Sequence, residues 1–175
     1  MTDPVTIRSL DGAQATALAD ALADILIDCV EGGASVGFMP PLTVAAARDF
    51  WHGVAASVAR GERMLLIAQD PAGTVQGTVQ LVTAMPPNQP HRADIAKMLV
   101  HRRARRQGVA GRLLAAAEQA ASAQGKHVLV LDTETDGAAE RLYARHGWIR
   151  VGEIPNYALK PDGRPCATTY FHKPL

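Results

Sequence analysis

Helical spacing of apolar residues dominates the first third of the chain. Residues 5–10 alternate between apolar and polar side chains, which predicts a short strand. Asp11 can cap a helix, and the apolar positions after it follow helical spacing as far as Gly32–Gly33. Thr43 can cap a second helix, which the pattern carries to about Gly61. We therefore expect one strand and two helices before the main sheet.

Strand-like patterns and turn residues fill much of the remaining chain. Two β-rich segments, 64–70 and 74–85, are separated by a Pro-Ala-Gly turn and predict a hairpin. The later segments are expected to be a strand over 92–100, a helix from Gly108 to Gly125, a strand over 127–133, a short helix over 138–147, a strand over 148–154, a loop over 155–165 and a strand over 167–173. Since no repeat or linker interrupts this order, it predicts one mixed α/β domain over residues 1–175.

Composition limits the classes of function to consider. The 175 residues are 47% apolar and 20% charged, as expected for a globular domain with its own core. The formal net charge of +1 gives no strong overall field for attracting nucleic acid or an anionic membrane. Cys29 and Cys166 lie far apart, and with no CxxC or His/Cys cluster they indicate neither a disulfide framework nor a metal site. Because the N-terminus lacks a leader pattern and no apolar run is long enough to span a bilayer, we expect a cytoplasmic protein.

The segment from Arg102 to Arg112 places five arginines and two glycines where a strand is expected to give way to a helix. A helix N-terminus offers unpaired amides and a partial positive charge to a phosphate group, and glycine lets a ligand approach the backbone closely. Neither G-x-x-x-x-G-K-[ST] nor G-x-G-x-x-G is present, so a P-loop and a dinucleotide fingerprint are excluded. The segment predicts a diphosphate site, with an ordinary solvent-exposed arginine loop as the alternative.

Three stretches resemble the GNAT superfamily of N-acetyltransferases. Arg105–Ala110 matches R-x-x-G-x-A, the acetyl-CoA pyrophosphate loop pattern of that superfamily. The stretch "IAKMLVH" resembles the family strand whose backbone pairs with pantetheine, and "AAERLYARHGWIRVGE" resembles the segment after the coenzyme A site. The resemblance implies a GNAT-like fold with a twisted, mostly antiparallel central sheet flanked by helices, and acetyl-CoA as the acetyl donor. It also implies a cofactor site formed by Met98, Leu99, Val100, Arg105, Arg106, Gln107, Gly108, Val109, Ala110, Gly111 and Arg112.

The same resemblance implies Tyr143 and Asp94 as candidate catalytic residues, and alternation along the next strand adds Asp132. Tyr143 matches a family tyrosine that protonates the departing thiolate, and the alternative is a tyrosine packed with its ring inward. Asp94 stands where many family members carry a glutamate that removes the amine proton through water. The alternative for Asp94 is a surface carboxylate paired with Arg92. Asp132 and Glu134 share one face of the next strand by alternation and can assist or replace Asp94.

Two other positions are interpreted as structural. Asp136 stands where the family often has an asparagine that contacts coenzyme A, and we interpret it instead as the N-cap of the short helix. Neither cysteine has a histidine near it in sequence, which disfavours an acetyl-cysteine intermediate.

The acceptor region resembles that of the tabtoxin-resistance acetyltransferases within the superfamily. The stretches "EGGASVGFM", "LDTE" and "VGEIPNYALKPDGR" carry this resemblance. It implies substrate contacts from Glu31, Ser35 and Phe38, with Trp51 as a further candidate. Glu134 is added as an acidic residue expected at the amine end of the cleft. A hydrophobic plug is the alternative for Phe38 and Trp51. Acidic residues at this end of the cleft favour a cationic amine, so we expect a small amino-acid-like acceptor, a toxin or an antibiotic.

The expected function is transfer of an acetyl group from acetyl-CoA to a primary amine of a small molecule, by direct attack in a ternary complex. A protein or peptide N-acetyltransferase and a non-catalytic acyl-CoA-binding module remain as alternatives. A nucleic-acid-binding module built on the arginines disagrees with the near-neutral charge and the 5% aromatic content. We expect no nucleic-acid or membrane partner and no metal, and the sequence leaves a homodimer open.

Overall fold

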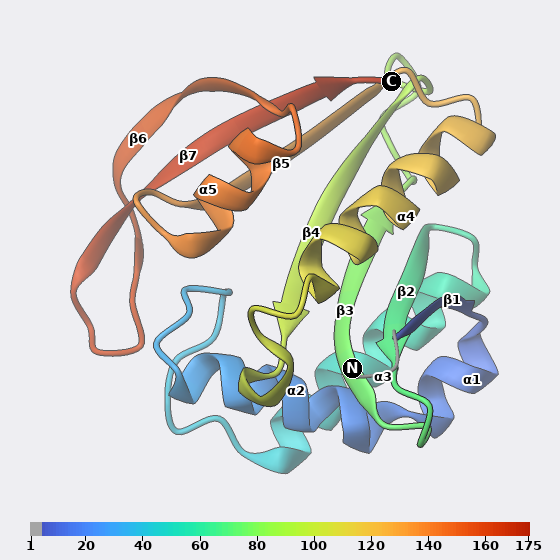
Figure 1. The fold of residues 1–175 in the computed structure, drawn as a ribbon, viewed down its shortest axis with the longest axis vertical. Helices are drawn as coiled ribbons and strands as arrows, with labels where there is room; N and C mark the ends of the chain where they lie inside the picture. The colour runs from blue at the N-terminus through green and yellow to red at the C-terminus, as the bar shows by residue number, and fades with distance from the viewer. Residues whose placement is uncertain (1–4) are drawn as a thin grey trace.

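The fold is built on one seven-stranded sheet with helices on both faces (Figure 1). A computed structural model describes residues 5–175. The elements are β1 (Thr6–Leu10), α1 (Gly12–Ala17), α2 (Ala19–Glu31), α3 (Val44–Ala59), β2 (Arg63–Gln69), β3 (Val75–Val82), β4 (Arg92–Val100), the 3₁₀ turn η1 (Arg102–Ala104), α4 (Val109–Ala123), β5 (Val128–Glu134), α5 (Ala138–Arg145), β6 (Ile149–Leu159) and β7 (Pro165–Pro174). The strand order is β1-β2-β3-β4-β5-β7-β6, and each neighbouring pair is antiparallel except β4 and β5. The expected mixed α/β class and mostly antiparallel sheet are confirmed.

Asp11 and Thr43 cap helices as expected. Asp11 begins α1 in a capping box with Gln14. Thr43 Oγ1 accepts a hydrogen bond from the Ala46 amide at 3.1 Å at the start of α3. The first expected helix is divided, however, because Leu18 leaves helical geometry between α1 and α2. One non-helical residue does not disturb the apolar period, so the pattern could not reveal this break.

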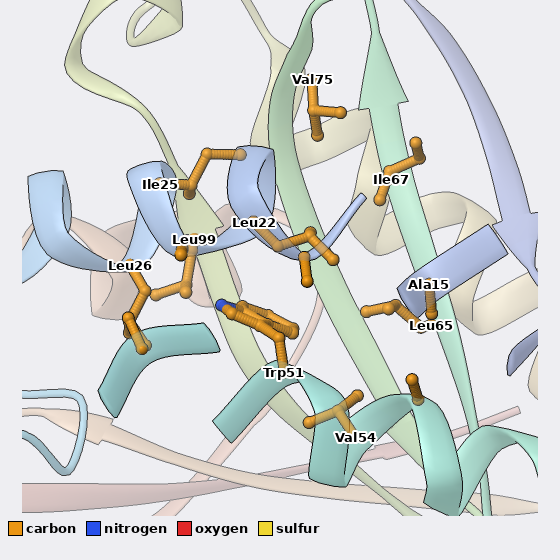
Figure 2. Packing of buried hydrophobic residues seen from close by; sticks show 14 of the residues in the cluster. Ala15, Leu22, Ile25, Leu26, Trp51, Val54, Leu65, Ile67, Val75 and Leu99 are labelled. Atoms are coloured by element: carbon orange, nitrogen blue, oxygen red, sulfur yellow. The ribbon is translucent and has the colours of Figure 1, made fainter. Parts of the chain in front are cut away.

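Two apolar clusters cover the two faces of the sheet. On one face, α1, α2 and α3 pack over β2, β3 and β4 and bury Leu22, Trp51 and Leu65 completely (Figure 2). On the other face, α4 and α5 cover a cluster that includes Leu113 and Phe171. We call these sides the α2–α3 face and the α4–α5 face. The clusters keep the two helix layers on opposite sides of the strands.

Strands β4 and β5 pair only at one end. A short parallel ladder joins residues 92–94 of β4 to residues 128–130 of β5. Beyond it, β4 continues to Val100 and β5 to Glu134 without pairing to each other. Figure 1 shows the two strands diverging from this junction, with β7, β6 and α5 on the β5 side. The backbone edge of β4 that faces β5 is therefore left without a strand partner along its second half.

The C-terminal hairpin is longer than expected. Residues 155–159, which the sequence pattern assigns to a loop, belong to β6, and β7 begins at Pro165. Asn156 has φ +55° at a register shift of β6 against β7. The turn-forming residue types of this stretch misled the prediction, because a bulge in an edge strand accommodates them.

Candidate active site

The N-terminus of α4 presents backbone amides that the fold does not use. Gly108 precedes the helix with φ +77° and provides no side-chain cap. Arg106 is also left-handed, with φ +61°. Across residues 5–175, no protein acceptor meets the backbone amides of residues 106–111 with good hydrogen-bond geometry. Amides grouped in this way at a helix N-terminus bind phosphate oxygens, so the segment fits a diphosphate.

Asp28 anchors the segment from Arg102 to Arg112, which we call the arginine loop, to α2. The residue is only 6% exposed, and its carboxylate accepts from the Arg102 amide at 2.8 Å and from the Arg102 guanidinium. Burial raises the pKa of Asp28, but the bonds from Arg102 outweigh burial and hold the pKa below its usual value. Arg103 donates to the Val75 carbonyl of β3 at 2.9 Å. These two arginines therefore hold the loop against the fold.

The arginines expected at the cofactor differ in their surroundings. Arg105 donates through Nε to the Val100 carbonyl at 3.2 Å, so part of its guanidinium is engaged within the protein. Arg106 and Arg112 are exposed, and within the described chain their side chains make no ion pair or hydrogen bond. Arg106 and Arg112 are thus the arginines of this segment whose side chains are available to a ligand.

A β-bulge directs the second half of β4. Between the partners of Thr78 and Gln80, β4 contains one residue more than β3, and Lys97 takes φ +49° there. Residues 98–100, all expected to border the cofactor, follow the bulge. Leu99 is buried against the α2–α3 face, whereas its two neighbours pack toward the α4–α5 face. The bulge thus sets the directions of the side chains of residues 98–100, beside the gap where β4 and β5 no longer pair, which we call the β4–β5 separation.

Asp94 and Asp132 line one hollow at the junction of β4 and β5. The hollow has a volume of about 320 Å³. Their neighbours Ile95 and Leu131 are buried in the cluster of the α4–α5 face. Because side chains alternate along a strand, the two aspartates lie on the α2–α3 face. A larger hollow of about 430 Å³, beside the β2–β3 turn, holds neither carboxylate.

The two carboxylates of this hollow have different environments. Asp94 is partly buried and forms an ion pair with Arg92, the contact that the alternative interpretation required. Burial raises the pKa of Asp94, the Arg92 charge opposes this, and the Asp132 charge raises the pKa further, so that the pKa lies above its usual value. Asp132 is exposed and accepts from Thr168 Oγ1 at 2.9 Å. Asp94 therefore has the properties of a stronger base than an ordinary aspartate.

Tyr170 lines the same hollow and was missed by sequence reasoning. It lies opposite Asp132 in the ladder between β5 and β7. Its hydroxyl is 3.1 Å from that of Tyr157. This bond, then burial and the Asp132 charge, raise the pKa of Tyr170 to about 12. Alternation with Phe171 could have suggested a Tyr170 side chain facing away from the core, but not which strand would lie beside it.

Tyr143 lies on the α4–α5 face. It is 4% exposed, and its ring packs against Trp148 and Phe171, with centroid separations of 5.7 and 6.0 Å. Burial, and then the Asp132 charge, raise the pKa of Tyr143. The phenol therefore keeps its proton at neutral pH. An inward-packed ring and a proton-donating hydroxyl are compatible here, so the catalytic role stays a prediction.

The loop between α2 and α3 joins two parts of the α2–α3 face. Ser35 Oγ donates to the Leu159 carbonyl of the C-terminal hairpin at 3.3 Å. Phe38 packs edge-on against Phe50 of α3, with ring centroids 5.1 Å apart. These expected substrate-contact residues therefore lie on the same side of the sheet as Asp94 and Asp132.

The two glutamates expected at the substrate lie apart from each other. Glu31 is exposed at the end of α2, with a carboxylate oxygen 3.7 Å from the Arg102 guanidinium. Glu134, at the end of β5, forms an ion pair with Lys160. Glu31 is therefore beside the arginine loop, whereas Glu134 is beside the C-terminal hairpin.

Trp51 is a core residue and not a substrate contact. It has no exposed surface, and Figure 2 shows its ring among Leu22, Leu26 and Leu99. Its indole nitrogen has no acceptor among residues 5–175. The substrate role considered for Trp51 was wrong, because helical periodicity places it on the buried side of α3.

Asp136 does not cap α5. Gly137 holds the N-cap position without a side-chain bond, and Asp136 has φ +62°. The Glu140 carboxylate instead reaches back and accepts from the Asp136 amide. The N-cap interpretation was wrong: Asp136 lies one residue before the N-cap Gly137, and its amide is bonded by the Glu140 side chain from within α5.

Comparison with known proteins identifies the family of this chain. The model of the acetyltransferase (GNAT) family matches residues 20–148. The chain belongs to the GNAT family. An uncharacterized N-acetyltransferase of Azospirillum brasilense, from the hisH-hisA intergenic region, is 34% identical over 134 residues, which cover 75% of this chain and 76% of the relative.

Solved structures of GNAT proteins share the fold at lower identity. A ribosomal-protein-alanine N-acetyltransferase from Brucella melitensis is 23% identical with a TM-score of 0.79, covering 97% of this chain and 99% of the other. A phosphinothricin acetyltransferase from Sinorhizobium meliloti, in complex with acetyl-CoA, is 18% identical with a TM-score of 0.78, covering 100% and 89%. These likenesses establish the fold and leave the acceptor open.

As a GNAT protein, the chain is an acetyltransferase that depends on acetyl-CoA, as the sequence predicted. In the described part of the chain, none of the helices has the length and apolar character needed to cross a membrane. Nor does any group of His, Cys, Asp and Glu side chains within residues 5–175 form an arrangement suited to a metal ion.

Proposed function

We propose that this GNAT protein transfers the acetyl group of acetyl-CoA to the primary amine of a small amino-acid-like molecule, by direct attack in a ternary complex. The observation that carries the proposal is the separation of β4 from β5, with different chemistry on its two sides. Tyr143 is on the α4–α5 face with α4, while Asp94 and Asp132 are on the α2–α3 face. Donor and acceptor that enter from opposite faces can be held together at the separation.

The residues of the donor side fit acetyl-CoA. When bound, acetyl-CoA supplies a thioester that provides the acetyl group and a thiol that leaves. The amides of residues 106–111 would hold its diphosphate, with Arg106 and Arg112 adding charge-assisted bonds. The backbone near Leu99 would polarise the thioester carbonyl. The Tyr143 hydroxyl would hold the proton needed by the departing sulfur.

The residues of the acceptor side fit a small cationic amine. Asp94 would take the amine proton, through a water molecule because its side chain is short, and its raised pKa suits that role. Asp132 would add negative charge that attracts an ammonium group. A hollow of about 320 Å³ is in the range that holds a small ligand. The sequence stretches that resemble tabtoxin-resistance enzymes lead us to propose a toxin or antibiotic as acceptor. This acceptor class stays a prediction, as do a cytoplasmic location and a homodimer.

A thiol-release assay with acetyl-CoA tests the proposal. The panel would contain free amino acids, small amines, lysine-containing peptides and peptides with free N-termini, with a blank lacking acceptor. We expect faster thiol release with some of the small amino compounds than with any peptide, with the acetylated product confirmed by mass. Acetylation of peptides and of none of the small amines would overturn the small-molecule assignment and leave the acetyltransferase activity in place.

A further inference from the structure

Lys97 carries a positive charge that the fold does not balance with a carboxylate. Its ammonium lies 6.0 Å from the centroid of the Phe38 ring and 5.9 Å from that of Phe50. Throughout residues 5–175, no carboxylate oxygen lies within 4.0 Å of it, and it makes no hydrogen bond. Both rings lie at the outer limit of a cation–π contact, so they compensate little for the lost hydration of the ammonium.

The environment of Lys97 shows that the charge is partly withdrawn from water. Burial lowers the pKa of Lys97, and the Arg63 charge lowers it further, while the Asp132 charge opposes both. Because the Asp132 charge affects this pKa, Lys97 lies within electrostatic range of the hollow that Asp94 and Asp132 line. Lys97 and Asp132 form no ion pair. Its two aromatic neighbours come from α3 and the α2–α3 loop, so the ammonium lies on the face that carries Asp94.

A second hydrogen-bond donor near Lys97 also lacks an acceptor. Gln80 has no exposed surface, and its Nε2 has no partner among the described residues. Its Oε1 accepts from Arg63 Nη1 at 2.7 Å, which fixes the amide with Nε2 as the unused end. Gln80 lies opposite Ala96, the residue before Lys97. In this part of the α2–α3 face, donors and positive charge therefore exceed acceptors.

We propose that Lys97 is the subsite for the carboxylate of the acceptor. This inference rests on the proposed function and narrows it from amines in general to amino acids. An ammonium group directed at Asp94 and Asp132, and a carboxylate directed at Lys97, match the two charges of a zwitterion. The acceptor would supply the anion that Lys97 lacks, and Lys97 would select amino acids over amines without a carboxylate.

The test uses matched pairs of acceptors that differ only in the carboxylate: phenylalanine with 2-phenylethylamine, leucine with 3-methylbutylamine, and lysine with 1,5-diaminopentane. In the unaltered protein, we expect kcat/KM to be at least about tenfold higher for the amino acid of a productive pair, as a charge-assisted bond provides. Lys97→Met should remove this advantage by raising KM for the amino acid. The kcat/KM of the matching amine should change less than about threefold, within the range of an indirect effect.

Two further variants provide controls. Lys97→Arg keeps the charge and should retain part of the preference for the amino acid. Lys126→Met removes another partly buried lysine, one that donates to the Pro90 carbonyl at 2.8 Å, and should leave both substrates unaffected. Thermal unfolding of each variant would identify loss of folding. If Lys97→Met does not fold, the carboxylate subsite is tested by the kcat/KM ratios of the matched pairs in the unaltered protein and in Lys97→Arg.

The results separate this inference from the proposed function. Equal kcat/KM for both members of every pair would overturn the carboxylate subsite while leaving a small-amine acetyltransferase. An equal fall in kcat for amino acid and amine in Lys97→Met would also overturn the carboxylate subsite. It would indicate that Lys97 acts on the thioester or stabilises the fold. If no member of any pair is acetylated while peptides are, the proposed function fails and the subsite with it.

Discussion

Gly108 and Gly125 lie at the two ends of α4 with nearly the same backbone conformation, φ +77° and +70°. A Cβ atom added at either glycine would meet no protein atom within 4 Å. A side chain at either position therefore costs only the strain of a left-handed L-residue, about 1–2 kcal/mol. The difference between them is functional, because only Gly108 adjoins the unbonded amides of residues 106–111.

Gly108→Val should weaken acetyl-CoA binding by about tenfold or more, since each lost charge-assisted bond is worth about 1.5–3 kcal/mol. Gly125→Val is the matched control and should lower the free energy of unfolding by a similar amount without changing affinity. Calorimetric titration with acetyl-CoA and urea unfolding measure the two effects. Equal affinity in both folded variants would remove the α4 N-terminus from the donor site.

Asp94→Asn should lower turnover by about 10²-fold or more, as loss of a general base does. In the unaltered protein, activity should fall as pH drops through the raised pKa of Asp94, at a pH above the usual 3.8. Asp132→Asn removes a charge that raises this pKa, so it should shift the acidic limb of kcat/KM to lower pH and retain turnover. Loss of turnover in Asp132→Asn but not in Asp94→Asn would show that Asp132 is the base.

Sequence reasoning proposed site roles for residues that stand in local sequence patterns. Gly108 stands in a six-residue pattern, and Asp94 at a counted position in a strand. Lys97 and Tyr170 were missed because each depends on neighbours that are distant in the chain. Lys97 meets two aromatic rings from another part of the sequence, and Tyr170 faces Asp132 only because β7 is inserted between β5 and β6.

Among the elements, α2 and the arginine loop depend on each other through one buried carboxylate. Asp28 holds both the backbone and the guanidinium of Arg102, across 74 positions of sequence. The pKa of Asp28 in the fold lies below its usual value of 3.8. Its stabilising contribution is therefore complete above about pH 4 and is lost as pH falls through the lower folded value.

Asp28→Asn should lower the free energy of unfolding by about 1–3 kcal/mol at pH 7, since it weakens charge-assisted bonds of a buried group. The difference from the parent should narrow as pH falls from about 4 through the lowered pKa of Asp28. Asp24→Asn, one turn earlier on α2, removes an exposed partner of Arg103 at 3.3 Å and should cost less than about 1 kcal/mol. Urea unfolding at pH 7 and at a pH below about 4 measures these free energies. Equal losses of unfolding free energy in the two variants would contradict the anchoring role of Asp28.

The order and type of the elements could be predicted because apolar periodicity and caps are local signals. The hairpin of β2 and β3, the β4 strand and the α4 helix follow the expected pattern closely. The division of the first helix and the full length of β6 could not be predicted. Each depends on a single unusual backbone position, Leu18 and Asn156, which the apolar pattern does not register.

At the scale of the whole molecule, the incomplete pairing of β4 and β5 gives the sheet an opening with chemically distinct sides. No sequence pattern could predict this opening, since it depends on where two strands stop being neighbours. Its two-sided form favours direct transfer over an acetyl-enzyme. Cys29 and Cys166 are both buried, and burial raises the pKa of the Cys29 thiol, which makes it a poor nucleophile.

Initial rates measured while acetyl-CoA and one accepted amine are varied together test this central claim most directly. Direct transfer requires both substrates to be bound at once, so double-reciprocal plots at different fixed concentrations of the second substrate should intersect. A covalent acetyl-enzyme would release coenzyme A before the amine binds and would give parallel lines. Intersecting lines are the predicted result, and parallel lines, together with an acetylated protein isolated in the absence of amine, would contradict transfer across the β4–β5 separation.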